Sequence, residues 1–134
     1  MKRMIIVLAV VFLGLPYAVK GPFGAFLLYL WVAYFRPDDT AVFDARYMLE
    51  EDDGTLILVN NRGFLWGRTP DVMGRLRKWA FEGGAPVPHA EYYLRANPSF
   101  EVSTGKHDWL TRQVFVGVGE RKPDGNLVRY YALT

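Results

Sequence analysis

The sequence predicts a mainly β protein, an antiparallel barrel or half-barrel with one α-helix, preceded by an apolar segment. Three observations carry this prediction. Residues 40–67 and 113–133 each contain two strand-like runs around a turn signal, residues 69–84 have helical spacing, and residues 4–35 are almost free of charge. The chain thus divides into an apolar segment, residues 1–35, and a partial β-barrel domain, residues 36–134.

The charges are distributed unevenly between these two parts. Of the 16 basic residues four precede residue 37, whereas all 14 acidic residues follow it. The second part is therefore nearly neutral, which argues against a nucleic-acid surface, because such a surface needs clustered Lys and Arg. The chain has no cysteine, which excludes a disulfide framework and thiolate chemistry.

The apolar segment predicts membrane association through helices. From Met4 to Phe35 the only charged residue is Lys20, and a spanning helix needs about 20 apolar residues. Pro16 and Pro22 break the run, so a single broken span and a hairpin of two short helices turning at residues 20–22 both remain open. A signal peptide, or the core of a soluble fold, would also account for an apolar run of this kind.

The distribution of charge favours the hairpin among the membrane arrangements. Lys2, Arg3 and Arg36 share one side of the membrane if the segment is a hairpin, and the positive-inside rule makes that side cytoplasmic. We therefore expect a membrane protein whose barrel domain is cytoplasmic. A signal peptide would instead make the domain secreted or periplasmic.

The elements of the barrel domain follow in order. Residues 40–54 end in Asp53-Gly54, a hairpin turn signal, and residues 55–67 form the returning strand. A helix is expected over residues 69–84, with Thr69 as N-cap and Gly83 at the C-terminus. A strand follows in "EYYLRANPSF", residues 91–100, and a last hairpin joins residues 113–121 to 127–133.

No motif in the sequence indicates a particular reaction. His89 and His107 are far apart and have no partner at metal-ligand spacing, so neither a metal nor another cofactor is indicated. Ser103, His107 and Asp108 lie on one loop, whereas the members of a triad normally converge from separate segments. The acidic run at residues 50–53 lacks the spaced oxygen ligands of a calcium loop.

The strand "EYYLRANPSF" carries the strongest signal for a binding site. Alternation places Tyr93, Arg95 and Asn97 on one face, and Tyr92 and Leu94 on the other. If the first face lines the barrel, Arg95 and its neighbours suit an anionic or oxygen-rich ligand. If the apolar face lines it, the polar side chains meet water.

Several blocks of the sequence also resemble a known family. They are "DARYMLEEDDGTLILVNNRG", "DVMGRL", "EYYLRANPSFE", "WLTRQVFVGVGER" and "VRYYAL", in this order. They are similar to the domain of unknown function 3237, also called uncharacterised protein family 0311, over residues 36–134. The family pattern falls on Asp53, Gly54, Asn61, Arg62, Gly63, Tyr93, Arg95, Pro98, Phe100, Glu101, Trp109 and Leu110. The chain departs from it at Leu94, at Thr111 and in residues 66–68.

The resemblance implies a barrel related to the allene oxide cyclase barrels, with a central cavity. Family members begin with further strands, and this chain has the apolar segment in their place, so an incomplete barrel is expected. Its exposed strand edges would invite pairing in a homodimer. The apolar segment, residues 15–37, loosely resembles the start of membrane O-antigen ligase-like proteins.

These considerations predict a membrane-associated protein that binds a small organic ligand. The expected ligand-binding residues are Arg95 as the charge anchor, with Tyr93, Asn61, Glu101 and Trp109 around it. If the protein is an enzyme, the related barrels suggest cyclisation or isomerisation. The alternative is a non-catalytic assembly subunit, or a truncated family member without activity.

Overall fold

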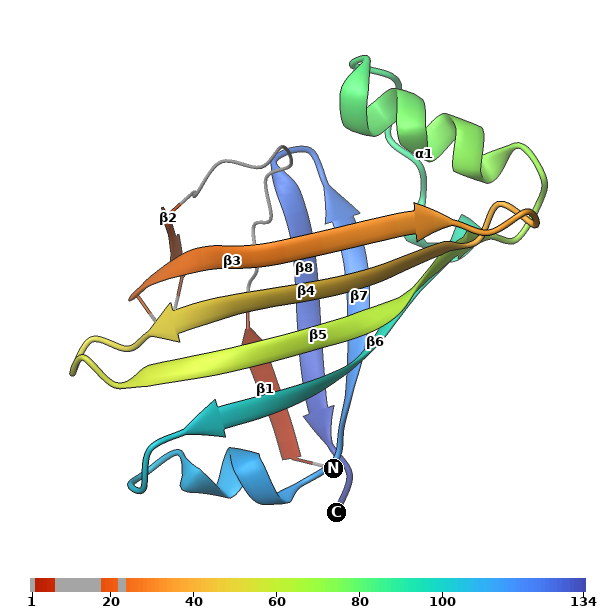
Figure 1. The fold of residues 1–134 in the computed structure, drawn as a ribbon. Coiled ribbons are helices and arrows are strands. Elements are labelled where there is room, and N and C mark those ends of the chain that lie inside the picture. The colour runs from red at the N-terminus through yellow and green to blue at the C-terminus, as the bar shows by residue number, and fades with distance from the viewer. Residues whose placement is uncertain (1, 7–17, 22–23) are drawn as a thin grey trace.

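The computed structural model describes residues 2–6, 18–21 and 24–134, and the strands among them form one antiparallel sheet (Figure 1). The order of the strands in the sheet is β1-β8-β7-β6-β5-β4-β3-β2. The strands are β1 (Lys2–Ile6), β2 (Ala18–Gly21), β3 (Gly24–Phe35), β4 (Ala41–Glu50), β5 (Leu56–Gly67), β6 (Tyr92–Val102), β7 (Phe115–Lys122) and β8 (Gly125–Ala132). The helices are α1 (Val72–Phe81) and the 3-10 helices η1 (His89–Glu91) and η2 (Asp108–Arg112).

The sheet curls into a half-barrel. In Figure 1, β3 to β6 run across the view while β7, β8 and β1 run steeply to them, so the sheet encloses a concave face. Its outer strands, β1 and β2, do not pair with each other among the described residues. The predicted mainly β, incomplete barrel is therefore confirmed as a half-barrel, and all five strands expected after residue 36 are present as β4 to β8.

Both predicted hairpins are also present. β4 pairs with β5 from Glu50 opposite Leu56 onward, and the turn between them contains Gly54 with φ +82°. This left-handed conformation favours glycine, and the Asp53 side chain accepts a hydrogen bond from the backbone N–H of Thr55 (2.9 Å). β7 and β8 pair up to Lys122 opposite Gly125.

Alternation along the strands decides which side chains face the concave side. In β4 the buried positions are Ala41, Ala45, Tyr47 and Leu49, and the residues between them are more exposed. The side chains of the concave face and of the helices packed against it form two cores. The η2-side core is Ala45, Tyr47, Leu49, Ile57, Val59, Phe100, Leu110, Phe115, Val128, Tyr130 and Ala132. The helix-side core is Ala41, Val72, Met73, Leu76, Val87, Tyr92 and Leu94.

Helix α1 covers the end of the concave face that the helix-side core fills. It begins two residues later than the sequence predicts, because Asp71 and not Thr69 occupies the N-cap position, and the Thr69 hydroxyl donates to the Asp71 carboxylate (2.7 Å). Gly83, with φ +69°, follows the helix, as its predicted closing role requires. The first residue of α1, Val72, is fully buried, which stabilises the docked helix by about 1.5–3 kcal/mol.

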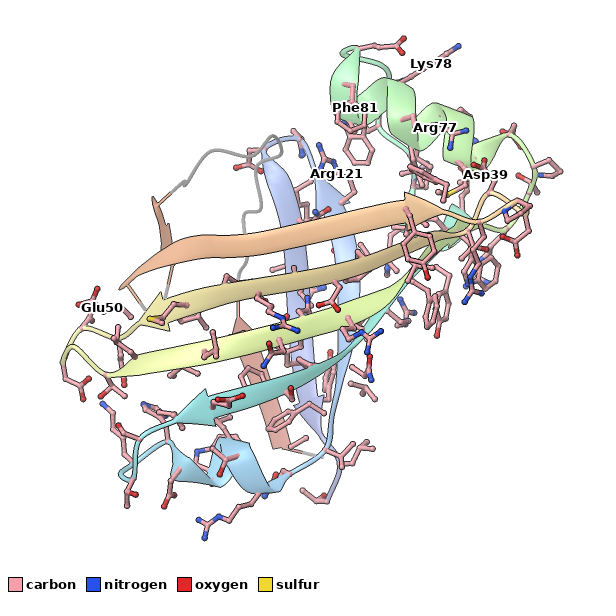
Figure 2. All side chains as sticks on the ribbon, viewed as in Figure 1. Asp39, Glu50, Arg77, Lys78, Phe81 and Arg121 are labelled. Atoms are coloured by element: carbon pink, nitrogen blue, oxygen red, sulfur yellow. The ribbon has the colours of Figure 1, made fainter. Side chains whose placement is uncertain are left out.

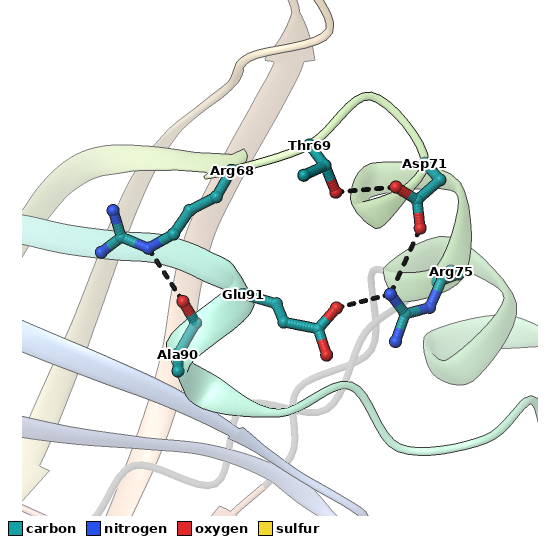
Figure 3. Close-up of polar contacts among 6 residues, drawn as sticks. All are labelled: Arg68, Thr69, Asp71, Arg75, Ala90 and Glu91. Atoms are coloured by element: carbon teal, nitrogen blue, oxygen red, sulfur yellow. Dashed lines mark hydrogen bonds and ion pairs between the residues drawn. The ribbon is translucent and has the colours of Figure 1, made fainter.

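Polar contacts hold the start of α1 against η1 (Figure 3). Arg75 pairs with Asp71 of the N-cap (3.2 Å) and with Glu91 of η1. Arg68 donates from Nε to the carbonyl oxygen of Ala90 (2.8 Å). These contacts fix the helix to the sheet at the point where β5 ends and β6 begins.

The helical structure expected for residues 1–35 is wrong for the part of this segment that is described. β1, β2 and β3 are strands, and β3 pairs with β4 from Phe26 opposite Leu49 to Phe35 opposite Ala41. An apolar run without a polar face fits a buried strand as well as a helix, and the aromatic residues of β3 favour the strand. Gly21 of β2 pairs with Gly24 of β3, and residue 22 of the expected turn lies outside the described residues.

Residues 7–17, including Pro16, lie outside the described residues. Across the described ranges, no helix is long and apolar enough to cross a membrane.

Candidate functional site

A cavity of about 430 Å³ lies between α1 and the concave face of the sheet. Side chains from both cores surround it, so it occupies the space that the two cores leave between them. It is lined by Phe35, Ala41, Phe43, Ala45, Tyr47, Asn61, Leu65, Met73, Leu76, Arg77, Ala80, Phe81, Tyr92, Leu94, Arg95, Ala96, Gly119, Arg121, Asn126 and Val128.

The walls of the cavity are mostly apolar, and small residues leave its volume open. Ala41 and Ala45 of β4 contribute only methyl groups, and Ala80 does the same from α1. Gly119 of β7 instead accommodates the Leu94 side chain, which lies where a Cβ would be. A cavity of this size and lining is typical of a site for a small apolar molecule.

One polar cluster lies on the concave face, where the η2-side core borders the cavity. The hydroxyl oxygens of Tyr47 and Tyr130 are 2.8 Å apart, and both side chains are fully buried. Burial raises the pKa of Tyr130, and hydrogen bonds with Tyr47 and Asn61 offset part of this rise. Burial also raises the pKa of Tyr47, so both phenols are neutral at physiological pH.

Arg121 brings a positive charge to the cavity. It lies at the end of β7, beneath α1 and near Phe81 (Figure 2). Its guanidinium lies over the Trp79 ring, 5.8 Å from the centroid, and burial lowers the pKa of the side chain. Within residues 34–134 it forms no ion pair, and its buried Nε has no hydrogen-bond partner.

The other two arginines at the cavity are already engaged. Arg77 of α1 binds the Asp39 carboxylate through two hydrogen bonds of 2.8 and 3.1 Å (Figure 2). The hydrogen bonds with Arg77 lower the pKa of Asp39, so the pair is ionised. Arg95 donates to the carbonyl oxygen of Leu94 (2.9 Å), and its guanidinium lies over the Tyr93 ring at 4.9 Å.

The five residues that the sequence predicts as ligand-binding do not form one cluster. Asn61 is buried and lines the cavity, and Arg95 borders it. Glu101 is exposed on the outer face of β6. Trp109 packs against the η2-side core, with its ring 5.9 Å from that of Phe115.

Of the two orientations that the sequence leaves open for this strand, the structure has the one in which Tyr93 faces away from the concave side. Tyr92 and Leu94 are buried on the concave face and line the cavity, and Tyr93 is stacked on Trp66 on the other side of the sheet (5.0 Å). The reason is physical, since these two apolar side chains fill the helix-side core beneath α1. Because side chains alternate along a strand, Tyr93 must then face outward.

Three residues of the site were not predicted from the sequence: Tyr47, Tyr130 and Arg121. A signal for Arg121 exists in "VGVGER", where Gly117, Gly119 and Arg121 share one face of the strand. The space beside these glycines is filled by Tyr130 at Gly117 and by Leu94 at Gly119, and the next residue on that face, Arg121, lines the cavity.

The acidic run at residues 50–53 holds two loops together. Glu51 and Asp53 both bind the Lys106 ammonium (2.9 Å each), and Glu51 also contacts His107. The hydrogen bond to Lys106 holds the pKa of the Asp53 carboxyl well below its usual range. Among the described side chains, no group of three His, Cys, Asp or Glu residues is arranged to hold a metal ion.

The comparisons with known proteins agree with this architecture. The family model for the protein of unknown function DUF3237 matches residues 31–133. The chain belongs to the DUF3237 family. The match begins inside β3, and it gives no support to the loose likeness of the apolar segment to O-antigen ligase-like proteins.

Curated relatives of this DUF3237 protein carry the name UPF0311 protein. The UPF0311 protein of Clostridium acetobutylicum is 33% identical over 100 residues, which are 74% of this chain and 59% of the relative. A UPF0311 protein of Rhodopseudomonas palustris is 31% identical over 103 residues, which are 77% of this chain and 60% of the relative. The chain thus spans about three-fifths of the length of these relatives.

Solved structures share the fold. A conserved protein of unknown function from Rhodopseudomonas palustris has a TM-score of 0.69 and 26% identity, covering 81% of this chain and 72% of its own. A beta-barrel like protein from Acinetobacter baumannii has a TM-score of 0.66 and 20% identity, covering 99% of this chain and 94% of its own. The second likeness shows a β-barrel-like fold alone.

Proposed function

We propose that this DUF3237 protein binds a small, mainly apolar molecule with one anionic group in the cavity beneath α1. The observation that carries the proposal is Arg121, a half-buried cation that borders an apolar cavity and forms no ion pair among residues 34–134, where Asp124 acts on its charge only from beyond ion-pair distance. Arg121 replaces Arg95, the anchor expected from the sequence, in this role.

The physical argument rests on desolvation. Burial lowers the pKa of Arg121, which means that the protein stabilises its positive charge less well than water does. An anion in contact with the guanidinium restores this stabilisation through charge-assisted hydrogen bonds, which are about twice as strong as neutral ones. The apolar remainder of the molecule gains about 25 cal/mol for each Å² that leaves water.

The experiment is a titration of the purified full chain with three compounds. Decanoate has an anionic group and an apolar chain, decanol has the chain alone, and acetate has the anion alone. We expect decanoate to bind at least about tenfold more tightly than decanol, since a hydrogen bond to a charged group contributes about 1.5–3 kcal/mol. Acetate should not bind measurably. Equal affinity for decanoate and decanol, or binding of neither, would refute the proposal.

A pair of variants of α1 tests whether the compound occupies this cavity. Ala80 lines the cavity, whereas Lys78, two residues earlier, is exposed. Ala80→Trp should fill the space and abolish decanoate binding, and Lys78→Trp adds the same ring outside and should leave binding unchanged. Unchanged binding by a folded Ala80→Trp protein would place the decanoate site elsewhere.

The remaining expectations from the sequence stay proposals. These are cyclisation or isomerisation of a bound molecule, membrane attachment through residues 1–35 with a cytoplasmic domain, and dimerisation through strand edges. No contact in the described residues supports any of the three. Membrane fractionation of the full chain and of a variant without residues 1–35 tests the attachment. Recovery of both proteins in the soluble fraction would exclude it.

A further inference from the structure

The outer face of the sheet carries aromatic side chains where β5 ends and β6 begins. Phe64 and Trp66 of β5 are 43% and 36% exposed. In the register of the two strands Arg95 lies opposite Phe64, and Tyr93 lies opposite Trp66, so these four residues share one face. Neighbouring exposed aromatic side chains on one face indicate an interaction surface.

An arginine lies against each of three rings on this face. The pairs, with the distance from the guanidinium carbon to the ring centroid, are Arg36 over Phe64 (5.4 Å), Arg68 over Trp66 (5.8 Å) and Arg95 over Tyr93 (4.9 Å). Trp66 and Tyr93 are also stacked on each other. The six residues therefore form one layer of rings and guanidinium groups, which we call the outer patch.

The outer patch is positively charged. None of its three arginines forms an ion pair among residues 34–134, and Asp38 acts on Arg36 only from beyond ion-pair distance. The carboxylates of Asp44 and Glu120, on neighbouring strands, pair with other basic residues. The charge of the patch is therefore complementary to an anionic partner.

The ring faces decide which anionic partner fits. Single-stranded nucleic acid binds by stacking its bases on free ring faces. In the outer patch the rings stack on each other or lie under guanidinium groups, so they offer few faces to a base. At an anionic bilayer, arginines contact the phosphate groups, and exposed aromatic side chains are favoured at the level of the headgroups.

We propose that the outer patch docks on the surface of a bilayer that contains anionic phospholipids. This contact differs from membrane attachment through residues 1–35, and it is independent of ligand binding in the cavity. Each arginine near such a surface strengthens binding about fivefold, and salt weakens this attraction.

The test is sedimentation of the full chain with vesicles at low salt. Vesicles of phosphatidylcholine mixed with phosphatidylglycerol are anionic, and vesicles of phosphatidylcholine alone are neutral. We expect the anionic vesicles to bind at least about tenfold more tightly. Equal binding to both kinds of vesicle, or binding to neither, would overturn the proposal.

Two pairs of substitutions show whether the patch or the net charge matters. Arg36→Gln with Arg68→Gln removes two charges from the patch, and Arg46→Gln with Lys78→Gln removes two elsewhere. All four residues are exposed and form no ion pair among the described side chains. The first pair should weaken binding to anionic vesicles about ten- to thirtyfold, and the second less than about threefold. Equal losses would overturn the proposal.

Tryptophan fluorescence locates the contact without removing a charge. Trp66 lies in the outer patch, whereas Trp109 packs against the η2-side core. Lipids with acyl chains brominated near the headgroup quench a tryptophan at the bilayer surface. We expect quenching in the wild-type protein and in Trp109→Phe, and its loss in Trp66→Phe. Quenching that persists in a folded Trp66→Phe protein would overturn the proposal.

A single-stranded oligonucleotide tests the other anionic partner. We expect it not to displace the protein from anionic vesicles, because the patch offers few ring faces for stacking. Binding of the oligonucleotide that depends on Arg36 and Arg68, without binding to vesicles, would make the patch a nucleic-acid surface and overturn the proposal.

Discussion

The hydroxyl oxygens of Tyr47 and Tyr130 lie 2.8 Å apart, although 83 residues separate them in the chain. Tyr47 belongs to β4 and Tyr130 to β8, and these strands are not neighbours in the sheet. The bond therefore crosses the concave face and joins the two sides of the half-barrel.

The tyrosine pair predicts a stability effect. Tyr47→Phe removes one hydroxyl and leaves that of Tyr130 buried with one partner fewer, so we expect a loss of about 1–3 kcal/mol in the free energy of unfolding. Chemical denaturation measures this loss. Tyr131→Phe, next to the pair but on the less buried face of β8, should change the free energy by less than about 0.5 kcal/mol.

The double variant checks the mechanism. Removing both hydroxyls leaves no unpaired donor between the rings, so Tyr47→Phe with Tyr130→Phe should cost less than the sum of the two single changes. Strict additivity of the two losses would mean that the hydroxyls do not act as a pair.

A second prediction concerns two glycines that face different surroundings. A Cβ at Gly63 of β5 would lie 2.9 Å from the Cα of Ala96 and against the carbonyl oxygen of Arg95, both backbone atoms. Gly63→Ala should destabilise the protein by about 1–3 kcal/mol or more, because the two strands would have to separate. Thermal or chemical unfolding measures the change.

Gly74 of α1 is the matched control. A Cβ there would meet no atom within 4 Å, so Gly74→Ala should stabilise the helix by about 0.5–1 kcal/mol. Similar effects of the two substitutions would contradict the close approach of β5 and β6 at Gly63.

The fold was largely predictable because its signals are local. The turn at Asp53-Gly54 and the spacing of the α1 residues each follow from a few neighbouring positions, and both are found in the structure. The residues of β3 were predicted to be helical and form a strand, since an apolar run alone does not distinguish a strand from a helix. Pairing of β3 with β4 is a long-range property that no local pattern contains.

The site was harder to predict because it depends on which face of each strand is concave. Alternation correctly separates Tyr93 and Arg95 from Tyr92 and Leu94, but it does not say which set faces inward. The position of α1 settles this, since Tyr92 and Leu94 pack in the core beneath it. Tyr47 and Tyr130 meet only after the sheet has curled, and their sequence context therefore gives no sign of the contact.

The network around Lys106 predicts a dependence of stability on pH. Hydrogen bonds to Lys106 lower the pKa of Glu51 and of Asp53 from their ordinary values of 4.5 and 3.8. Carboxyls with a lowered pKa in the folded state contribute stability above their ordinary pKa, and this contribution is lost as the pH falls through the folded value. We expect the free energy of unfolding to decrease as the pH falls below about 4.5.

Lys106→Met should make this decrease shallower, because it removes the partner that both carboxylates share. Lys78→Met removes an exposed lysine that forms no ion pair within the described structure, and it should leave the pH profile unchanged. Unfolding measured between pH 2 and pH 6 in each protein checks the prediction. Parallel profiles for all three proteins would contradict it.

A further prediction concerns the ion pair at the cavity. Asp39 neutralises Arg77, which lines the cavity from α1. Asp39→Asn leaves Arg77 unpaired, so decanoate should bind about two- to fivefold more tightly, with the gain reduced by salt because the pair is partly exposed. Asp38→Asn removes a neighbouring charge that forms no ion pair in the described structure and should have no such effect. Weaker binding by Asp39→Asn would contradict the prediction.

The measurement that tests the central claim most directly is the affinity of decanoate for Arg121→Gln and for Arg95→Gln. Both arginines border the cavity, but the Arg95 guanidinium donates to the Leu94 carbonyl oxygen, whereas the buried Nε of Arg121 has no hydrogen-bond partner. We predict that Arg121→Gln weakens binding about tenfold or more, and that Arg95→Gln changes it less than about twofold. The opposite order, or equal losses in the two variants, would contradict the assignment of Arg121 as the anion anchor.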